Sequence, residues 1–207
     1  MKRINTLLLT GWALVAALTV SAQTMTRYVS IPGSCKVLIE GTSNIHDWTV
    51  EGNVIAGFLE VDKDALVKGT AGPVKAAVSV KITVRSLKSG KEKMDEVMQE
   101  HMKEDQFKFI EYKLDELKIV KGSLDKGLEC ESKGDLTISG VTKKIDLPVT
   151  ITKVDDEKVK VVGKIDLKMT TFGIKPPEPK LAMGLIKTGD DVKVSIEWAI
   201  RERKDQK

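Results

Sequence analysis

The sequence predicts an all-β fold of eight antiparallel strands, with one amphipathic helix between the third and fourth strands. Apolar and polar residues alternate over most of the chain, turn residues separate the alternating runs, and one short run has a helical period instead. The alternation is clearest from Gly134 to Ile151 (GDLTISGVTKKIDLPVTI), on either side of Gly140. Because successive side chains of a strand point to opposite faces, this stretch predicts a hairpin with one apolar face. A lone hairpin is marginally stable, so that face needs cover from the other strands.

The first half of the chain contains three predicted strands. Residues 27–33 form a lead-in segment that ends in a Pro32-Gly33 turn. The strands that follow are predicted over 35–41, 48–61 and 74–84.

The second and third strands show which side chains face inward. In the second strand Gly52 marks a bend or bulge. The apolar phase of that strand is Trp48, Val50, Val54, Ala56 and Phe58. The apolar phase of the third strand is Val74, Ala76, Val78, Val80, Ile82 and Val84. Both sets are predicted to share the covered face.

A helical period replaces the alternation after the third strand. Ser89 and Glu92 have the spacing of a capping box, which predicts a helix that begins near Gly90. The apolar stripe of this helix is Met94, Val97, Met98, His101 and Met102. Such a stripe usually packs against a core. Over the mouth of a barrel, its methionines would make an adaptable lid.

The second half of the chain returns to strands. Between residues 107 and 120 the alternation changes parity, which predicts β-bulges. After the hairpin and an Asp155-Asp156 turn, the seventh strand is predicted over 159–167 and the eighth over 192–200. Residues 170–185 contain three prolines and two glycines, which predicts a long loop between them.

The N-terminus has the layout of a secretory signal peptide. Lys2 and Arg3 precede an apolar run, and Val20-Ser21-Ala22 fits a small-residue cleavage site. The run is shorter than the ~20 apolar residues of a spanning helix, which argues against a membrane anchor. We therefore expect a signal peptide over 1–22 and a periplasmic or secreted protein.

The mature chain has the size of one domain. Removing the first 22 of the 207 residues leaves 185, enough for a single barrel domain over 23–207. Without Lys2 and Arg3 the formal net charge falls from +4 to +2, which does not suggest a nucleic-acid partner.

Two cysteines, Cys35 and Cys130, remain in the mature chain. Both share strand parity with apolar neighbours, so both are expected to face inward. An oxidising compartment favours a disulfide bridge between them. Two small buried thiols are the alternative, and the sequence does not decide between these interpretations.

Eight sequential antiparallel strands have two common arrangements, two stacked sheets or one closed barrel that removes the sheet edges. An eight-stranded barrel has an interior that side chains can fill or that can hold one small ligand. Inward positions include the small residues Gly52, Ala56, Ala76 and Gly163, which leave room. A hollow and a filled barrel both stay open on this basis.

His46-Asp47 is the one candidate for catalysis, because an acidic neighbour can orient an imidazole. Adjacent residues on a strand point to opposite faces, however, and the chain has only two histidines. A zinc site normally needs three or four ligands with recognisable spacing. We expect no catalytic residue and no metal, with His46 as a loop histidine near the barrel mouth.

Four stretches resemble the YceI-like family. They are SCKVLIEGTSNIHDWTVEG (34–52), KMDEVMQEHMKEDQFKFIEYKL (93–114), the hairpin 134–151, and LKMTTFGIKPPEPKLAMGLIKTGDDVKVSIEW (167–198). Together they follow the order of the family and span nearly the whole mature chain. Two positions depart from it. Ile110-Glu111 stands where the family often has a proline-isoleucine step, and Cys35 stands where a small polar residue is common.

The resemblance implies a lipocalin-like barrel with an apolar tunnel that binds a polyisoprenoid, a quinone-like molecule or a fatty chain, and no other cofactor. The implied partner is an apolar lipid, with transient membrane contact and without a membrane-spanning segment; a homodimer stays open. The alternatives are a structural envelope or stress protein with a filled barrel, and a lipid-modifying enzyme that uses His46. The candidate ligand-binding residues are Trp48, Val50, Phe58, Val78, Val80, Leu114, Leu136, Ile138, Ile145, Leu147, Phe172 and Trp198.

Overall fold

The hairpin around Gly140 is present as β8 (Gly127–Ile138) and β9 (Val141–Lys153) in the computed structural model, which describes residues 25–178 and 186–204. The two strands pair without a register shift from Leu128 and Ile151 to Ile138 and Val141. Ser139 and Gly140 between them have positive φ angles of 50° and 78°. Two positive φ angles are typical of a two-residue type I′ turn, whose twist matches that of the strands.

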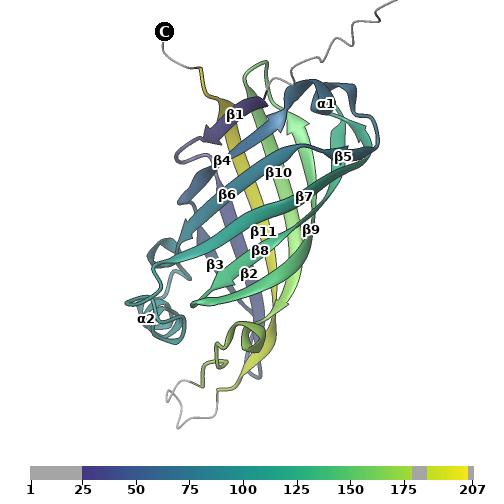
Figure 1. Cartoon of the computed structure of the whole chain (residues 1–207). Coiled ribbons are helices and arrows are strands. Elements are labelled where there is room, and N and C mark those ends of the chain that lie inside the picture. The colour runs from purple at the N-terminus through teal and green to yellow at the C-terminus, as the bar shows by residue number, and fades with distance from the viewer. Residues whose placement is uncertain (1–24, 179–185, 205–207) are drawn as a thin grey trace, which may run out of the picture.

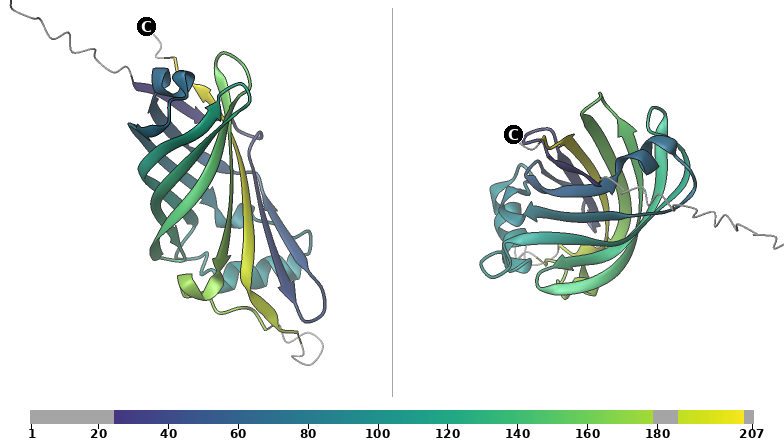
Figure 2. Two further views of the ribbon diagram at one scale, coloured as in Figure 1. Left: turned by 90° about the vertical axis from the view of Figure 1, so that its right-hand side faces the viewer. Right: turned by 45° about the horizontal axis from the view of Figure 1, so that its top comes forward.

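Eight strands close into one antiparallel ring (Figure 1). The ring contains β8 and β9 and is completed where the first strand pairs with the last, from Tyr28 and Glu202 to Ser30 and Ile200. Its other strands are β1 (Met25–Ser30), β4 (Ile55–Asp62), β6 (Ala76–Thr83), β7 (Phe109–Ser123), β10 (Lys158–Lys168) and β11 (Thr188–Glu202). The second view in Figure 2 shows this wall curving around an axis. The predicted closed eight-stranded barrel is confirmed, and two stacked sheets are excluded.

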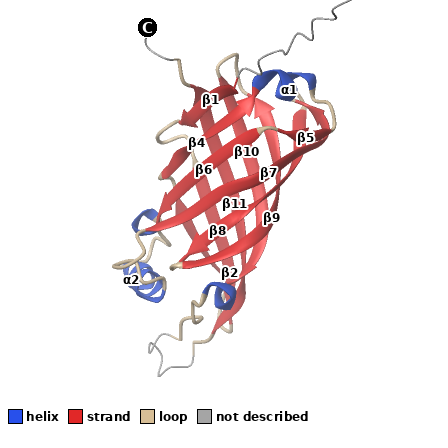
Figure 3. Cartoon of the chain, in the orientation of Figure 1, coloured by secondary structure: helices blue, strands red, loops and turns tan. Residues whose placement is uncertain are grey.

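Three further strands extend the wall. β2 (Lys36–Ser43) pairs with β11 beyond the part that β1 occupies, and β3 (Trp48–Gly52) pairs with β2. The short β5 (Gly72–Val74) pairs with β7. The wall therefore lengthens along β11, and the barrel is elongated (Figure 3).

The prediction that residues 27–33 are only a lead-in was wrong, because residues 25–30 form β1. This strand pairs with β4 on one side and with β11 on the other. Tyr28 is its one fully buried side chain. Residues 25–30 therefore form a strand because they pair with β4 and β11, which are far away in the sequence. The segment has little alternation of apolar and polar residues that would predict a strand.

The single strand predicted over 48–61 is two strands with opposite phases. β3 ends at Gly52 and β4 begins at Ile55, and the break shifts the inward phase to Ile55, Leu59 and Val61. A shift of one residue moves a strand's side chains to the opposite face. Phe58 therefore faces outward, with the Arg27 guanidinium 3.9 Å from the centre of its ring.

The described residues contain two short α-helices, where the sequence predicted one (Figure 1). The additional helix, α1 (Lys63–Lys68), is capped by the Asp62 carboxylate, which accepts a hydrogen bond of 3.2 Å from the Ala65 amide. Its one buried side chain is Leu66. A helix of six residues with one buried side chain has too little periodicity to predict. The expected helix is α2 (Glu92–His101), and two 3₁₀ turns lie at Val84–Ser86 and Met169–Phe172.

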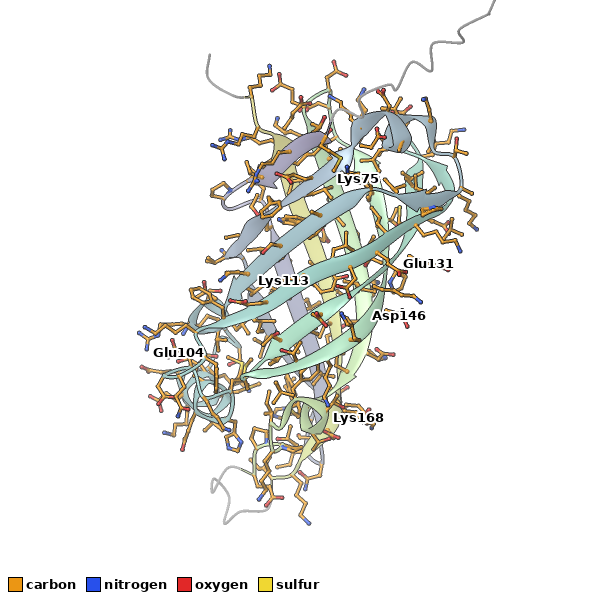
Figure 4. The ribbon with its side chains drawn as sticks, in the orientation of Figure 1. Lys75, Glu104, Lys113, Glu131, Asp146 and Lys168 are labelled. Carbon is orange, nitrogen blue, oxygen red and sulfur yellow. The ribbon has the colours of Figure 1, made fainter. Side chains whose placement is uncertain are left out.

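The barrel end beneath α1 is filled. Leu66 of α1 packs into one core cluster with Val61, Leu128 and Ile200 from three strands, all four with exposed fractions of 0–1%. On the outer face, Lys118 pairs with Glu131 across β7 and β8, and Glu131 and Asp146 project away from the wall (Figure 4). Exposed pairs of this kind contribute little to stability. The closed end is therefore held by apolar burial.

Gly134 of β8 lies where the neighbouring strand β7 leaves no room for a side chain. A β carbon at this position would lie 2.2 Å from the Lys113 carbonyl oxygen and 2.8 Å from the Tyr112 ring. The neighbouring register shift in β7, between Leu114 and Glu116, is a bulge of the kind that the change of parity predicted. The absence of a side chain at Gly134 therefore permits both the close approach and the position of Tyr112.

We expect Gly134→Ala to lower the free energy of unfolding by about 1–3 kcal/mol, because backbone atoms must move to admit the methyl group. The measurement is urea unfolding. Gly163→Ala is the matched control, since a β carbon there would meet no atom nearer than 3.2 Å. Equal losses in the two variants would contradict this explanation.

Cys35 and Cys130 are both buried and both free, so the disulfide interpretation is not supported. Burial raises the pKa of the Cys130 thiol to about 11, and it also raises the pKa of the Cys35 thiol. The thiolate is the reactive form.

Both cysteines should therefore react slowly with a thiol reagent at pH 8 in the folded protein. In denaturant without reductant, the same reagent should titrate two thiols per chain. No thiol signal after denaturation would show that the two residues are bridged.

Candidate functional site

The barrel is hollow between its filled end and the opposite end. The cavity has a volume of about 460 Å³ and its lining is mostly apolar, with aliphatic side chains of the strands as the largest group. Gly163, which leaves room on β10, is part of this lining. The sequence did not decide between a hollow and a filled barrel. In the structure, one end of the barrel is filled and the other end is hollow.

Eleven of the twelve candidate residues line this cavity. They are Trp48, Val50, Val78, Val80, Leu114, Leu136, Ile138, Ile145, Leu147, Phe172 and Trp198. The twelfth, Phe58, is on the outer face for the reason given above. Further lining residues missed at first include Ile39, Ile82, Ile110, Val149, Val161, Val194 and Ile196. The same alternation marks most of these, so the pattern could have found them.

The two tryptophans of the barrel lie at different depths. Trp48 follows the β2–β3 turn, and its indole N–H donates to the Thr42 carbonyl at 3.0 Å. Trp198 lies toward the filled end, where its N–H donates to the Ser30 hydroxyl at 2.7 Å. Both indole N–H groups have acceptors in the barrel wall, so both rings are available to an apolar ligand.

Helix α2 lies across the open end of the barrel (Figure 2). Met94, Val97, Met98 and Met102 from the predicted stripe all line the cavity. Methionine is unbranched and adapts its shape to irregular contacts. The helix is therefore a cover whose inner face is as apolar as the strands.

Asp95 fixes the first turn of α2. Its carboxylate accepts hydrogen bonds of 2.7 Å from both the amide and the hydroxyl of Ser89, so Ser89 does not form the predicted capping box with Glu92. Burial alone would raise the pKa of Asp95, but the Ser89 hydrogen bonds and the Lys88 ammonium lower it overall. Lys88 in turn pairs through its backbone with Glu51 of β3. This chain of contacts connects the helix to the wall.

The other end of α2 is fixed by backbone carbonyls. The Ser139 hydroxyl at the hairpin turn donates to the Met102 carbonyl at 2.9 Å. The Nδ1 atom of His101 lies 2.8 Å from the Lys175 carbonyl, in the segment after the second 3₁₀ turn. Two parts of the barrel rim therefore hold the C-terminal turn in place.

The charged side chains that line the cavity belong to the open end. Lys91 and Lys93 come from the start of α2, and Lys168 from the end of β10. Lys93 pairs with Glu96 and Lys168 with Asp191, each at 2.7 Å. The interior is therefore uncharged, and its rim is only weakly basic.

His46 lies at this rim, as predicted, and its ring is exposed. Its Nδ1 atom is 2.8 Å from the backbone carbonyl of Asp47, so the Asp47 carboxylate does not orient the ring. In the part of the chain that the structure describes, no group of three or more His, Cys, Asp or Glu residues is arranged to hold a metal ion. The site offers an apolar compartment and no acid–base pair at His46.

These features define a class of protein, a hollow antiparallel barrel with one filled end and an apolar interior under a helical cover. The chain belongs to the YceI-like family, whose domain matches residues 32–200. A comparison with curated proteins finds no match. No helix within residues 25–178 and 186–204 is long and apolar enough to cross a membrane.

Three solved structures share the fold. BcnA of Burkholderia cenocepacia is 13% identical, with a TM-score of 0.65 over 82% of this chain and 98% of that one. A polyisoprenoid-binding domain from Saccharophagus degradans is 10% identical, with a TM-score of 0.62 over 85% and 98%. The YceI protein of Campylobacter jejuni is 15% identical, with a TM-score of 0.56 over 95% and 100%.

We expect Asp95→Ala to loosen α2 without unfolding the barrel, because it removes the contacts of the helix with Ser89 and Lys88. Amide hydrogen exchange of residues 92–101 should accelerate relative to β8 and β9. Glu96→Ala is the control, since Glu96 lies on the exposed face of the same helix.

The contribution of Asp95 should also depend on pH. Its pKa is lower in the folded state than the unfolded value of about 3.9. The stabilisation is therefore complete above that value and is lost as the pH falls through the lower, folded pKa. Helix protection that does not change between pH 7 and pH 3 would contradict the assignment.

Proposed function

We propose that this protein is exported and carries a long apolar lipid, an isoprenoid, a quinone-like molecule or a fatty chain, in its barrel. The hollow interior is the observation that supports carriage over a purely structural role. Each buried CH₂ group contributes ~0.8 kcal/mol, so ten would supply roughly 8 kcal/mol and micromolar affinity without any polar contact. One of the fold relatives is described as a polyisoprenoid-binding domain, which points to the same class of ligand.

Export is part of the proposal. The predicted signal peptide, residues 1–22, lies outside the described residues, which begin at Met25. Mass spectrometry of the exported protein should find Gln23 as its first residue. A chain that keeps its apolar N-terminus would argue for an anchored protein instead.

The direct test of carriage is organic extraction of the purified mature protein, followed by lipid mass analysis. Val80→Trp should lower the amount of bound lipid several-fold, because the indole would occupy the cavity that Val80 lines. Ala77→Trp on the exposed face of the same strand is the matched control. Circular dichroism checks that both variants fold.

Equal lipid content in the two variants would show that the ligand lies outside the barrel. Turnover of a lipid ester that disappears in His46→Ala would favour the lipid-modifying alternative.

A further inference from the structure

Two hydroxyl groups stand inside the apolar cavity. Tyr112 of β7 and Ser132 of β8 both line it, and Ser132 is only 4% exposed. The Tyr112 hydroxyl donates to the Ser132 oxygen at 3.2 Å, and the Ser132 hydroxyl donates to the Leu147 carbonyl at 2.7 Å. Ser132 lies six residues from Ile138 at the open end, roughly 20 Å along the strand. This polar pair is therefore separate from the charged rim.

The hydrogen bonds leave Tyr112 free to change partner. Ser132 gives its proton to the shorter bond with Leu147, so it keeps a partner if Tyr112 turns away. The Tyr112 O–H could then donate to a carbonyl oxygen, while its lone pairs could accept a proton from a hydroxyl group. One side chain in this position can therefore bind either kind of neutral oxygen.

The end of the Tyr112 side chain lies over Gly134, where a β carbon would come within 2.8 Å of both the ring carbon Cζ and the hydroxyl oxygen. A phenylalanine would still cover this glycine with its ring, so packing alone does not require a hydroxyl group here. Placing a hydroxyl in an apolar interior costs free energy unless it is hydrogen-bonded.

The surroundings favour a neutral group over an ion. Burial raises the pKa of Tyr112, so its phenol stays protonated. Among the described residues that line the cavity, the lysines are Lys91, Lys93 and Lys168, all at the rim. An ionised head group this far inside would have no opposite charge, and burying it unpaired is very costly.

We propose that Tyr112, positioned by Ser132 and Gly134, binds a hydroxyl or carbonyl group at the buried end of the lipid. The lipid then enters oxygen end first, with its tail toward α2. This inference rests on the proposed lipid carriage.

The test compares three ligands with the same number of carbon atoms, hexadecan-1-ol, hexadecane and hexadecanoate. Each displaces the same apolar fluorophore from the mature protein. The alcohol should bind about three- to tenfold more tightly than the alkane, the size of one net hydrogen bond. In Tyr112→Phe this ratio should fall to near one. Tyr28→Phe is the matched control, because Tyr28 is the other tyrosine of the chain and does not line the cavity. This variant should keep the wild-type ratio.

The orientation has its own measurement, which needs no variant at position 112. An alcohol brominated near the end of its tail should quench the fluorescence of Trp48 near the rim more than that of the deeper Trp198. Trp48→Phe and Trp198→Phe separate the two signals.

Three results would overturn the inference: equal affinity for the alcohol and the alkane in the wild type, an unchanged ratio in Tyr112→Phe, or tightest binding of hexadecanoate. Stronger quenching of Trp198 would also overturn it, because the tail would then lie inside. The proposed carriage itself fails only if none of the three ligands binds.

Discussion

Closure of the strand ring is the constraint on which the rest of the molecule depends. An open sheet of this length would leave two rows of unpaired N–H and C=O groups, and pairing of β1 with β11 joins its two sides into a ring, so that among the described strands an outer edge stays on β3, which pairs as a strand with β2. Backbone hydrogen bonds then hold the wall, and the interior side chains need not fill the space completely. This is why one half of the barrel can be a packed core while the other half stays hollow. The filled end supplies the apolar burial that the hollow end gives up.

The cover of the hollow end is built from contacts of a different kind. Asp95, Ser139 and His101 hold α2 through a few polar groups at its two ends, whereas the ring is held along whole strands. Free energies of local opening are lowest where few contacts must break. We therefore expect the helix to move more easily than a strand of the ring, and its Met94, Met98 and Met102 pack against the core and line the cavity. A barrel that takes up a long molecule needs this division between a permanent wall and a lightly held cover.

The alternation of apolar and polar residues was enough to predict the barrel and most of the cavity wall. A strand that buries one face has apolar residues at every second position, so the buried face can be identified from the sequence. It failed at Phe58, where the break at residues 53 and 54 reversed the phase without any change in composition. It also failed at β1, whose hydrogen bonds all go to distant strands. The predicted capping box of Ser89 with Glu92 was wrong, because Ser89 donates to Asp95 instead. Spacing alone does not show which acceptor a serine meets. The Tyr112–Ser132 pair could not be predicted because its two members come from different strands that only the register brings together.

The pairing of the first strand with the last has a consequence for how the chain assembles. Tyr28 meets Glu202 and Ser30 meets Ile200, so the contact that seals the wall joins the two ends of the domain. Synthesis begins at the N-terminus, so β1 is made long before β11. The pairing of β1 with β11 can therefore form only after nearly the whole chain has been synthesised. Contacts between such remote segments carry the largest loop-closure entropy and form late. Truncation of even the final few strand residues would thus leave an unsealed seam running beside the first strand.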